Sequence, residues 1–307
     1  MISDSKEGFS VNRDLLGEKD WVWTLDIGSI IAVDLHDFNL EEIWRMQNFK
    51  TLKFKDAIFF GQVRRKDGDL TRTRLGKGVM IYQNGRVYEG NWKNDLWDGS
   101  GYERYSNGNW YRGNFEEGKA NGIGVYQWVS GEVYDGDWKN GSKNGHGMWK
   151  GANGEVYIGE WKNSKANGFG VHTWANGDKY EGEWKDFLKH GTGTEYFSNG
   201  DMYTGNYEDG MPHGVGQYKW ASNAIYIGHF HKGLKQGWGR WQKDSNDICS
   251  NSYEGDYYQD KKFGLGEFWW ASGNLYQGYY KNDERDGIGE MWWIDGSMYK
   301  GEWVRGI

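Results

Sequence analysis

Proline and cysteine are almost missing from this chain of 307 residues, which contains one of each, Pro212 and Cys249. A single cysteine excludes an intramolecular disulfide scaffold and fits a reducing compartment. Glycine is abundant, at 49 residues, but disordered chains of biased composition are usually rich in proline as well. The glycines therefore have an ordered use, and scarce proline favours an uninterrupted β ladder. We expect Pro212 in a loop, where a missing N–H costs nothing.

Long apolar runs are also missing. No segment approaches the roughly 20 apolar residues of a membrane-spanning helix. The first residues, Met1 to Lys6, contain no secretory apolar core, Ile2 excludes N-myristoylation, and the C-terminus has no prenylation box. We therefore expect a soluble protein of the cytoplasm. The net charge of −7 disfavours nucleic acid and anionic lipid as partners, because both select cations.

Aromatic residues, in contrast, recur with a strict period. The pattern Tyr-x-Gly-x-aromatic occurs ten times, and consecutive tyrosines are 23 residues apart except for one interval of 27. In the nine complete units, the glycine of this pattern precedes a Gly-x-Gly by nine residues. Such a period indicates a repeat array, which builds a surface rather than a closed pocket. The tyrosines are Tyr88, Tyr111, Tyr134, Tyr157, Tyr180, Tyr203, Tyr226, Tyr253, Tyr276 and Tyr299.

Each unit reads as two strands. In the second unit, residues 111–115 and 122–128 alternate in the manner of strands and flank a loop at 116–121. Asn-Gly pairs such as Asn176-Gly177 then lead into the next unit, and we expect both residues to use their tolerance of positive φ. Chained hairpins of this kind predict one antiparallel meander.

The period also assigns two faces to the sheet. We expect tyrosines, glycines and the second aromatic residue on one face, with both glycines of Gly-x-Gly leaving room for rings. The other face, with Glu89, Asn91 and Lys93, is expected to be polar and solvated. The ring-face positions include Tyr88, Gly90, Trp92, Gly99, Gly101, Tyr134, Gly136, Trp138, Tyr180, Gly182 and Trp184.

The repeat resembles the MORN repeat (membrane occupation and recognition nexus). The resemblance rests on Tyr-Glu-Gly-Glu-Trp-Lys at 180–185, Gly-Thr-Gly at 191–193 and Asn-Gly-Asp at 199–201, and it extends over residues 76–307. It implies an all-β fold: an elongated, single-layer, twisted antiparallel meander of about ten hairpin repeats. A short mixed segment precedes the repeats.

Two irregularities set the boundaries. Residues 59–87 are interpreted as a degenerate first unit with an insertion of six residues, and 88–307 as the regular units of one array, 59–307. The other irregularity is the turn at 244–252, which is four residues longer and should protrude with Cys249. Residues 1–58 are a separate docking or capping segment, with short strands at 21–23 and 27–33 and a helix over 40–46. We expect this segment to cover the first edge of the array.

Nothing in the sequence favours catalysis. The Gly-x-Gly copies lack the third glycine and the helix of a nucleotide loop. His229 and His231 are two residues apart but lack partners at metal-ligand spacing. Carboxylates such as Glu89 and Glu181 recur at positions expected to be exposed, where cross-strand pairing explains them. We therefore expect no enzyme activity, no cofactor and no metal.

Three surfaces could bind partners. The ring face either covers itself or leaves a groove for a partner's segment. The chain stops halfway through a unit, so the last strand, with Tyr299 and Trp303, should expose an edge for homodimerisation or for strand addition by another subunit. The third surface is a basic cluster that is either a solvated loop or a contact for something acidic, formed by Arg64, Arg65, Lys66, Arg72, Arg74 and Lys77.

The leading hypothesis is a non-catalytic scaffold that holds protein subunits of a cytoskeletal assembly. MORN proteins without a catalytic domain resemble, as a group, components of axonemal complexes such as the radial-spoke heads of cilia, which implies a cilium or flagellum. The alternative is a membrane-proximal adaptor that binds phosphoinositides, as the arrays of junctophilins and of plant-type phosphatidylinositol-phosphate kinases suggest. A regulatory module for an enzyme on a separate chain is a third hypothesis.

Overall fold

The computed structural model describes residues 45–65 and 71–307. Within these ranges there is no helix, and 22 strands belong to one antiparallel sheet. The predicted antiparallel meander is thus confirmed. The chain divides into two compact units, residues 1–141 and 142–307.

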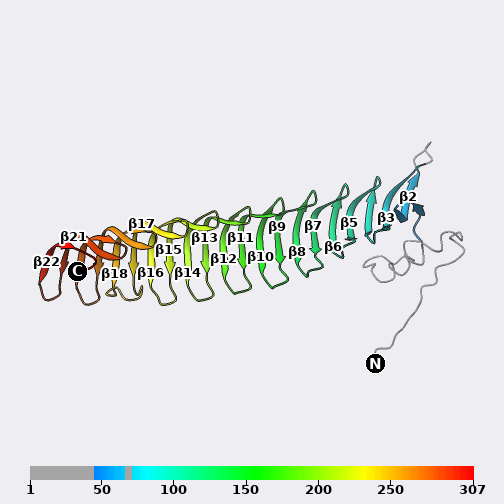
Figure 1. The fold of residues 1–307 in the computed structure, drawn as a ribbon. Helices are drawn as coiled ribbons and strands as arrows, with labels where there is room; N and C mark the ends of the chain where they lie inside the picture. Colours follow the sequence, from blue (N-terminus) through cyan, green and yellow to red (C-terminus); the bar gives the residue numbers. More distant parts are fainter. Residues whose placement is uncertain (1–44, 66–70) are drawn as a thin grey trace, which may run out of the picture. The chain divides into compact units, whose positions relative to one another are not determined.

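The first unit contains eight of the described strands, each paired with its neighbours in the chain. They run from blue towards green in Figure 1. Their bounds are β1 (Phe49–Lys53), β2 (Ala57–Arg65), β3 (Arg72–Tyr82), β4 (Val87–Lys93), β5 (Leu96–Arg104), β6 (Trp110–Glu116), β7 (Lys119–Gln127) and β8 (Val133–Lys139).

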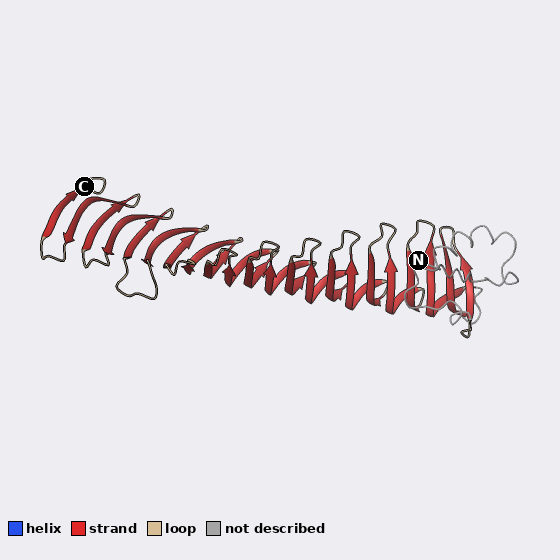
Figure 2. Ribbon diagram, turned by 90° about the horizontal axis from the view of Figure 1, so that it is seen from below, coloured by secondary structure: helices blue, strands red, loops and turns tan. Residues whose placement is uncertain are grey.

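The second unit contains fourteen strands in the same arrangement. They follow one another in chain order from green to red in Figure 1, and Figure 2 shows them as one layer of strands joined by short loops. Their bounds are β9 (Ser142–Lys150), β10 (Val156–Lys162), β11 (Lys165–Thr173), β12 (Lys179–Lys185), β13 (Leu188–Tyr196), β14 (Met202–Glu208), β15 (Met211–Lys219), β16 (Ile225–His231), β17 (Leu234–Gln242), β18 (Ser252–Tyr258), β19 (Lys261–Trp269), β20 (Leu275–Lys281), β21 (Glu284–Trp292) and β22 (Met298–Trp303).

The turn inside each repeat is tighter than the sequence suggested. In the second repeat only Glu117 and Gly118 separate the strands, in place of a loop over 116–121. Both residues have positive φ, 48° and 80°. A two-residue turn with left-handed residues at both positions matches the twist of the flanking strands, and this favours it in hairpins.

The Asn-Gly turns between repeats work differently from the expectation. At Asn176-Gly177 only the glycine has positive φ, at 91°. The asparagine Oδ1 instead accepts a hydrogen bond from the N–H of Asp178 at 3.0 Å, and Gly177 N–H bonds the Trp174 carbonyl at 3.0 Å. The asparagine is thus selected by its side-chain acceptor and the glycine by its backbone.

The two glycines of Gly-x-Gly have different roles. The first has positive φ, as at Gly99 (97°) and Gly168 (102°), and it lies where the pairing register shifts. A Cβ atom on Gly99 would meet Asn91 at 3.1 Å rather than a ring, so the expectation that this glycine makes room for a ring was wrong. It is needed because a β-bulge of this kind requires a left-handed residue.

The first hairpin is a lengthened repeat. Gly61 pairs with Gly78 as Gly90 pairs with Gly101, and the arms continue to the pair Arg65 and Arg72. β1 pairs with β2 along its other side, so residues 49–53 extend the sheet by one strand. The strands and most of the helix expected at 21–46 lie outside the described residues, and residues 45–48 form turns and a bend.

The structure contradicts the expected position of Pro212 and shows how the long turn at 244–252 is folded. Pro212 lies in β15 opposite Tyr207, not in a loop. At the equivalent position of the next repeat, Lys235 N–H bonds the Asp260 side chain at 2.8 Å, so proline there removes no ladder bond. The long turn at 244–252 is folded around Gln242, whose Nε2 bonds the carbonyls of Asp244 and Asp247, and it leaves Cys249 exposed.

Candidate functional site

The floor of the ring face is a row of tyrosines lying on glycines. A Cβ atom on Gly159 or Gly170 would come within 2.7 Å and 2.4 Å of the Tyr157 Oη. The glycines thus leave room for rings, as predicted, but each ring belongs to the same hairpin and starts two residues before the first of these glycines. The Tyr157 hydroxyl donates to the Glu160 carbonyl at 3.1 Å. The same bond, to the carbonyl three residues on, recurs at every repeat tyrosine.

A second aromatic row locks the first. Trp184 meets the ring of its own Tyr180 edge-on at 5.1 Å and that of the preceding repeat's Tyr157 at 5.5 Å. Its Nε1–H donates to the Gly170 carbonyl at 3.0 Å. Trp138 makes the equivalent bond to Gly124 at 2.9 Å in the first unit. These contacts link successive repeats into a spine of rings.

Both rows are closed to solvent in the second unit except at Tyr299. Tyr157, Tyr180, Tyr203, Tyr226, Tyr253 and Tyr276 are 0–3% exposed. Burial raises the pKa of these hydroxyls, among them those of Tyr203 and Tyr226. The rings of these two rows therefore cover one another, rather than leaving a groove for a partner's segment. Any partner must contact the side chains that lie above these rows.

An outer aromatic row lies on top of this spine. Its members in the second unit directly follow the second strand of a repeat and are largely half-buried. Some of them pack on the residue two positions earlier, as Trp220 does on Tyr218 at 4.7 Å. Trp270 packs on Phe268 in the same way at 4.5 Å. The outer aromatic row consists of Trp174, Phe197, Trp220, Trp270 and Trp293.

A row of cations runs beside it, nine residues after each repeat tyrosine. Lys235 lies over the rings of Tyr226 and Tyr257, and Arg285 over that of Trp303 at 4.1 Å. The cation row of the second unit consists of Lys143, Lys189, Lys235, Lys262 and Arg285.

Sequence reasoning missed the cation row. Ala166 and Pro212 occupy the same repeat position in other repeats, so no periodic signal marks it. The face on which the cations lie also follows only from the bulge at the Gly-x-Gly that comes two residues later, which period-two alternation does not reveal. The aromatic residues at fixed offsets from these cations were the only sign of the cation row in the sequence.

The second face of the sheet differs from the solvated polar surface that was expected. In the second unit, several residues between the two glycines of Gly-x-Gly are apolar and 49–58% exposed. These are Phe169, Val215, Trp238, Leu265 and Ile288.

In the first unit, the same face is closed around Glu89 but open at Ile123, which is 68% exposed. Glu89 was expected to be exposed but is 0% exposed, beside a buried apolar cluster. That cluster consists of Ile58, Phe60, Val79, Ile81 and Val87.

The basic cluster is not one surface. Arg74 is an internal residue: its Nε pairs with the Asp95 carboxylate at 2.9 Å and its guanidinium lies over Trp92 at 4.5 Å. Arg64, Arg65 and Arg72 are exposed on the arms of the β2–β3 hairpin. Lys77 is exposed further along β3, and Lys66 lies outside the described residues.

The two predicted edge residues lie on β22, which pairs with β21 and with no other described strand. Trp303 is buried against Tyr276 and Arg285, so it completes the ring spine. Tyr299 is 43% exposed, unlike the other repeat tyrosines.

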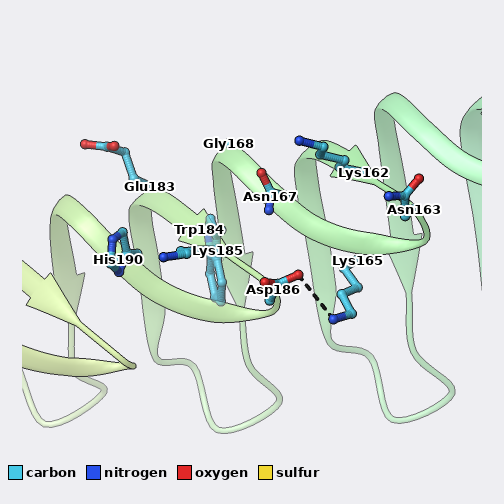
Figure 3. A pocket seen from close by; sticks show the side chains of 10 residues that line it. All are labelled: Lys162, Asn163, Lys165, Asn167, Gly168, Glu183, Trp184, Lys185, Asp186 and His190. Carbon is cyan, nitrogen blue, oxygen red and sulfur yellow. Dashed lines mark hydrogen bonds and ion pairs between the residues drawn. The ribbon is translucent and has the colours of Figure 1, made fainter.

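A hollow of about 590 Å³ lies between the turns of two repeats in the second unit (Figure 3). Its two carboxylates already have partners: Asp186 pairs with Lys165 at 3.2 Å, and Glu183 accepts from the N–H and hydroxyl of Thr192. Among the described residues, no group of three or more metal-ligating side chains occurs. The residues that line the hollow are Lys162, Asn163, Lys165, Asn167, Gly168, Glu183, Trp184, Lys185, Asp186 and His190.

The family profile of the MORN repeat matches nine segments of the chain, from residue 88 to 247 and from 253 to 298. The protein therefore belongs to the MORN-repeat family. This family consists in general of non-enzymatic repeat proteins. The described part of the chain contains no helix that is long and apolar enough to cross a membrane.

Solved structures offer only distant likenesses. The TCP10 domain of Danio rerio CPAP, in complex with a peptide of STIL, is 10% identical, covers 75% of this chain and 98% of its own, and gives a TM-score of 0.41. The TCP domain of Drosophila melanogaster SAS-4, with a proline-rich motif of Ana2, is 12% identical, covers 55% and 95%, and gives 0.33. No curated protein matches. TM-scores this low carry no argument about function.

Proposed function

We propose that this protein is a non-catalytic scaffold that holds protein subunits of a cytoskeletal assembly on the ring face of residues 142–307. The observation that carries the proposal is the outer aromatic row, which repeats half-buried rings above a closed spine. Large aromatic side chains supply much of the binding energy in protein interfaces, because they bury wide areas with few rotatable bonds.

The spine beneath makes the surface ready for binding. Its tyrosines are fixed at both ends, by the glycine floor and by the hydroxyl bond to the backbone. A rigid floor lowers the ordering cost of association. A row of equivalent positions also suits an extended partner, since most repeats of the second unit offer a ring at the same position, although Gly151 and Lys243 interrupt the row.

Partner capture with a matched surface control tests the proposal. The double variant Trp220→Ala and Trp270→Ala removes two rings of the outer aromatic row, and Trp238→Ala removes an exposed ring from the second face. Tagged proteins recovered from the source cells are compared by quantitative mass spectrometry. We expect the double variant to lose cytoskeletal subunits that the control retains. Equal recovery by all forms would refute a ring-face scaffold.

The finer proposal places the assembly in the ciliary axoneme, as a radial-spoke-like component. Its support is the resemblance of repeat-only MORN chains to that group, which is an analogy of architecture. Localisation of the tagged protein in ciliated cells tests it. Axonemal staining that survives detergent extraction is expected, and staining confined to the cell body would exclude this placement.

A membrane-proximal adaptor is the second candidate. The exposed Arg64, Arg65 and Arg72 on one hairpin favour it, because clustered guanidinium groups attract anionic head groups. Sedimentation with phosphoinositide vesicles tests this role. Binding that is lost in high salt and in an Arg64→Gln, Arg72→Gln variant would support the adaptor, and unchanged binding in that variant would count against this surface.

A further inference from the structure

Three cations of the cation row occupy consecutive repeats. Lys235 lies on β17, Lys262 on β19 and Arg285 on β21, so one strand lies between neighbouring cations. At about 4.8 Å per strand, their backbones are about 10 Å apart. All three are on the ring face of the second unit.

Each of the three is held against two rings. The Lys235 ammonium is 5.5 Å from the Tyr226 centroid and 5.1 Å from that of Tyr257. The Lys262 ammonium is 5.3 Å from Tyr253 and 5.0 Å from Phe268. Such contacts fix a cation and keep it charged without neutralising it.

The guanidinium of Arg285 is held in the same manner. It lies 5.6 Å from the Tyr276 centroid and 4.1 Å from that of Trp303. Its Nη2 also donates to the Gly306 carbonyl at 2.7 Å, which uses part of its hydrogen-bonding capacity but leaves the charge unchanged.

Another repeat provides an internal comparison. Lys189 occupies the same position, and there Glu195 forms a short ion pair with it. The residues six positions after Lys235, Lys262 and Arg285 are Trp241, Phe268 and Met291, which carry no charge.

Among the described residues, none of the three cations has an ion-pair partner within 4.0 Å. The facing carboxylates, Asp260 and Asp283, accept hydrogen bonds from the backbone N–H groups of Lys235 and Lys262 at 2.8 and 2.9 Å. Burial lowers the pKa of both lysines, against the opposing influence of these aspartates. Because no ion pair within 4.0 Å neutralises them, the three cations are able to accept carboxylates from a partner.

We propose that Lys235, Lys262 and Arg285 bind the carboxylates of an extended acidic segment of a partner protein, one carboxylate per repeat. In a polyproline II segment, three residues make one turn and cover about 9 Å, so acidic side chains at every third position lie on one side and match the row. Charge-assisted bonds to half-buried cations are strong because little water remains to screen them. The inference rests on the proposed scaffold function and names the chemistry of its partner.

Two synthetic peptides of identical composition test this inference. One carries glutamate at every third position of a Ser/Thr/Gly chain, and the other carries the same glutamates in a contiguous block. Binding to the full chain is measured by fluorescence anisotropy. We expect the spaced peptide to bind more tightly than the block peptide, and its affinity to fall about tenfold in the Lys235→Met, Lys262→Met variant.

The control is Lys261→Met, Lys281→Met, which removes the same charge from exposed lysines on the second face. It should change the affinity less than roughly twofold, since exposed charges on the opposite face of the sheet are screened by solvent and salt. If the double variant fails to fold, as judged by thermal melting, Lys235→Met alone is compared with Lys281→Met.

Three outcomes would overturn the inference: no binding of the spaced peptide, equal losses in both double variants, or a preference of the three cations for phosphoinositide vesicles over the peptide. Partner capture through the outer aromatic row is a separate measurement. It can succeed while the peptide fails, so failure of the acidic-segment inference and failure of the scaffold proposal are distinguishable.

Discussion

At the residue scale, the fold depends on one contact that each repeat makes anew, a tyrosine ring pressed on two glycines. The space beside those glycines is filled by the ring and the neighbouring strand: a Cβ on Gly159 would lie 2.5 Å from the Gly170 Cα and 2.7 Å from the Phe169 carbonyl oxygen. Neither atom can withdraw without breaking the ladder. Glycine is therefore required here by close packing rather than by φ.

Gly159→Val should lower the free energy of unfolding by at least about 1–3 kcal/mol, because the backbone atoms it meets cannot move aside. Glu181→Val, on the second face, is the control and should cost much less. Urea denaturation of both variants measures the difference. Similar small losses would contradict the packing of rings on glycines.

The buried tyrosines also predict a steep alkaline limit. Burial raises their pKa in the folded chain from 10.0, as at Tyr203 and Tyr226, while unfolded tyrosine titrates near 10. The stabilisation is complete below pH 10 and is lost as pH rises above it, because only the unfolded state releases the protons. Each such tyrosine should lower the unfolding free energy by about 1.4 kcal/mol per pH unit.

Urea denaturation between pH 8 and 11 measures this slope. Tyr203→Phe should reduce it by the contribution of one proton, at a cost of about 1 kcal/mol at neutral pH for the lost hydroxyl bond. An unchanged slope in this variant would show that the tyrosine is not the titrating group.

At the element scale, the turn of each hairpin is bonded to the hairpin before it. The second turn residue donates its N–H to the carbonyl of the preceding repeat's cation-row position, as Asp260 does to Lys235 at 3.0 Å. Where that residue is Asp or Ser, its side chain accepts the return bond. Phe187 donates to Ala166 at 3.1 Å but has no acceptor to return.

Phe187→Asp should therefore raise the unfolding free energy by about 0.5–1 kcal/mol. The new carboxylate would accept the Ala166 N–H, and aspartate tolerates the φ of 71° better than phenylalanine. Phe187→Ala is the control, since it removes the ring without adding an acceptor. Thermal melting of both decides the point: an aspartate variant no more stable than the alanine variant would disprove the return bond.

The hairpins were predictable because their determinants repeat. Tyr180, Gly182 and Gly193 recur at fixed offsets, and each offset maps to one contact. The cation row was not predictable, since Ala166 and Lys189 share a position and only the folded register shows what surrounds it. The burial of Glu89 escaped prediction for a related reason: its repeat equivalents, such as Asp135, are exposed, and a period cannot signal where one repeat departs from the others.

At the scale of the whole molecule, the outer edge of β22 is a predicted assembly surface. Trp293 N–H bonds the Ser297 carbonyl at 2.9 Å, and hydrogen-bonded pairs alternate in an antiparallel ladder. The N–H groups of Tyr299, Gly301 and Trp303 therefore point to β21, and that of Glu302 points outwards. An outward row of donors and acceptors pairs with another strand if nothing covers it.

Glu302→Pro should abolish self-association or strand addition at this edge, because proline removes one outward donor and leaves the bonds to β21 in place. Glu302→Ala is the matched control. Analytical ultracentrifugation and partner capture give the readout. If the proline variant keeps the oligomeric state and the partners of the alanine variant, this edge is not an interface.

In the second unit, the pairing of each strand with its chain neighbours alone has a thermodynamic consequence. In the second unit no side of a hairpin meets a distant part of the chain, so the free energy accumulates as a sum of nearest-neighbour couplings. Fraying at β22 then removes one coupling at a time, whereas opening in the interior breaks two. Amide exchange should accordingly slow, repeat by repeat, from β22 towards the middle of the unit, so that a partner bound at the end would protect residues it never touches.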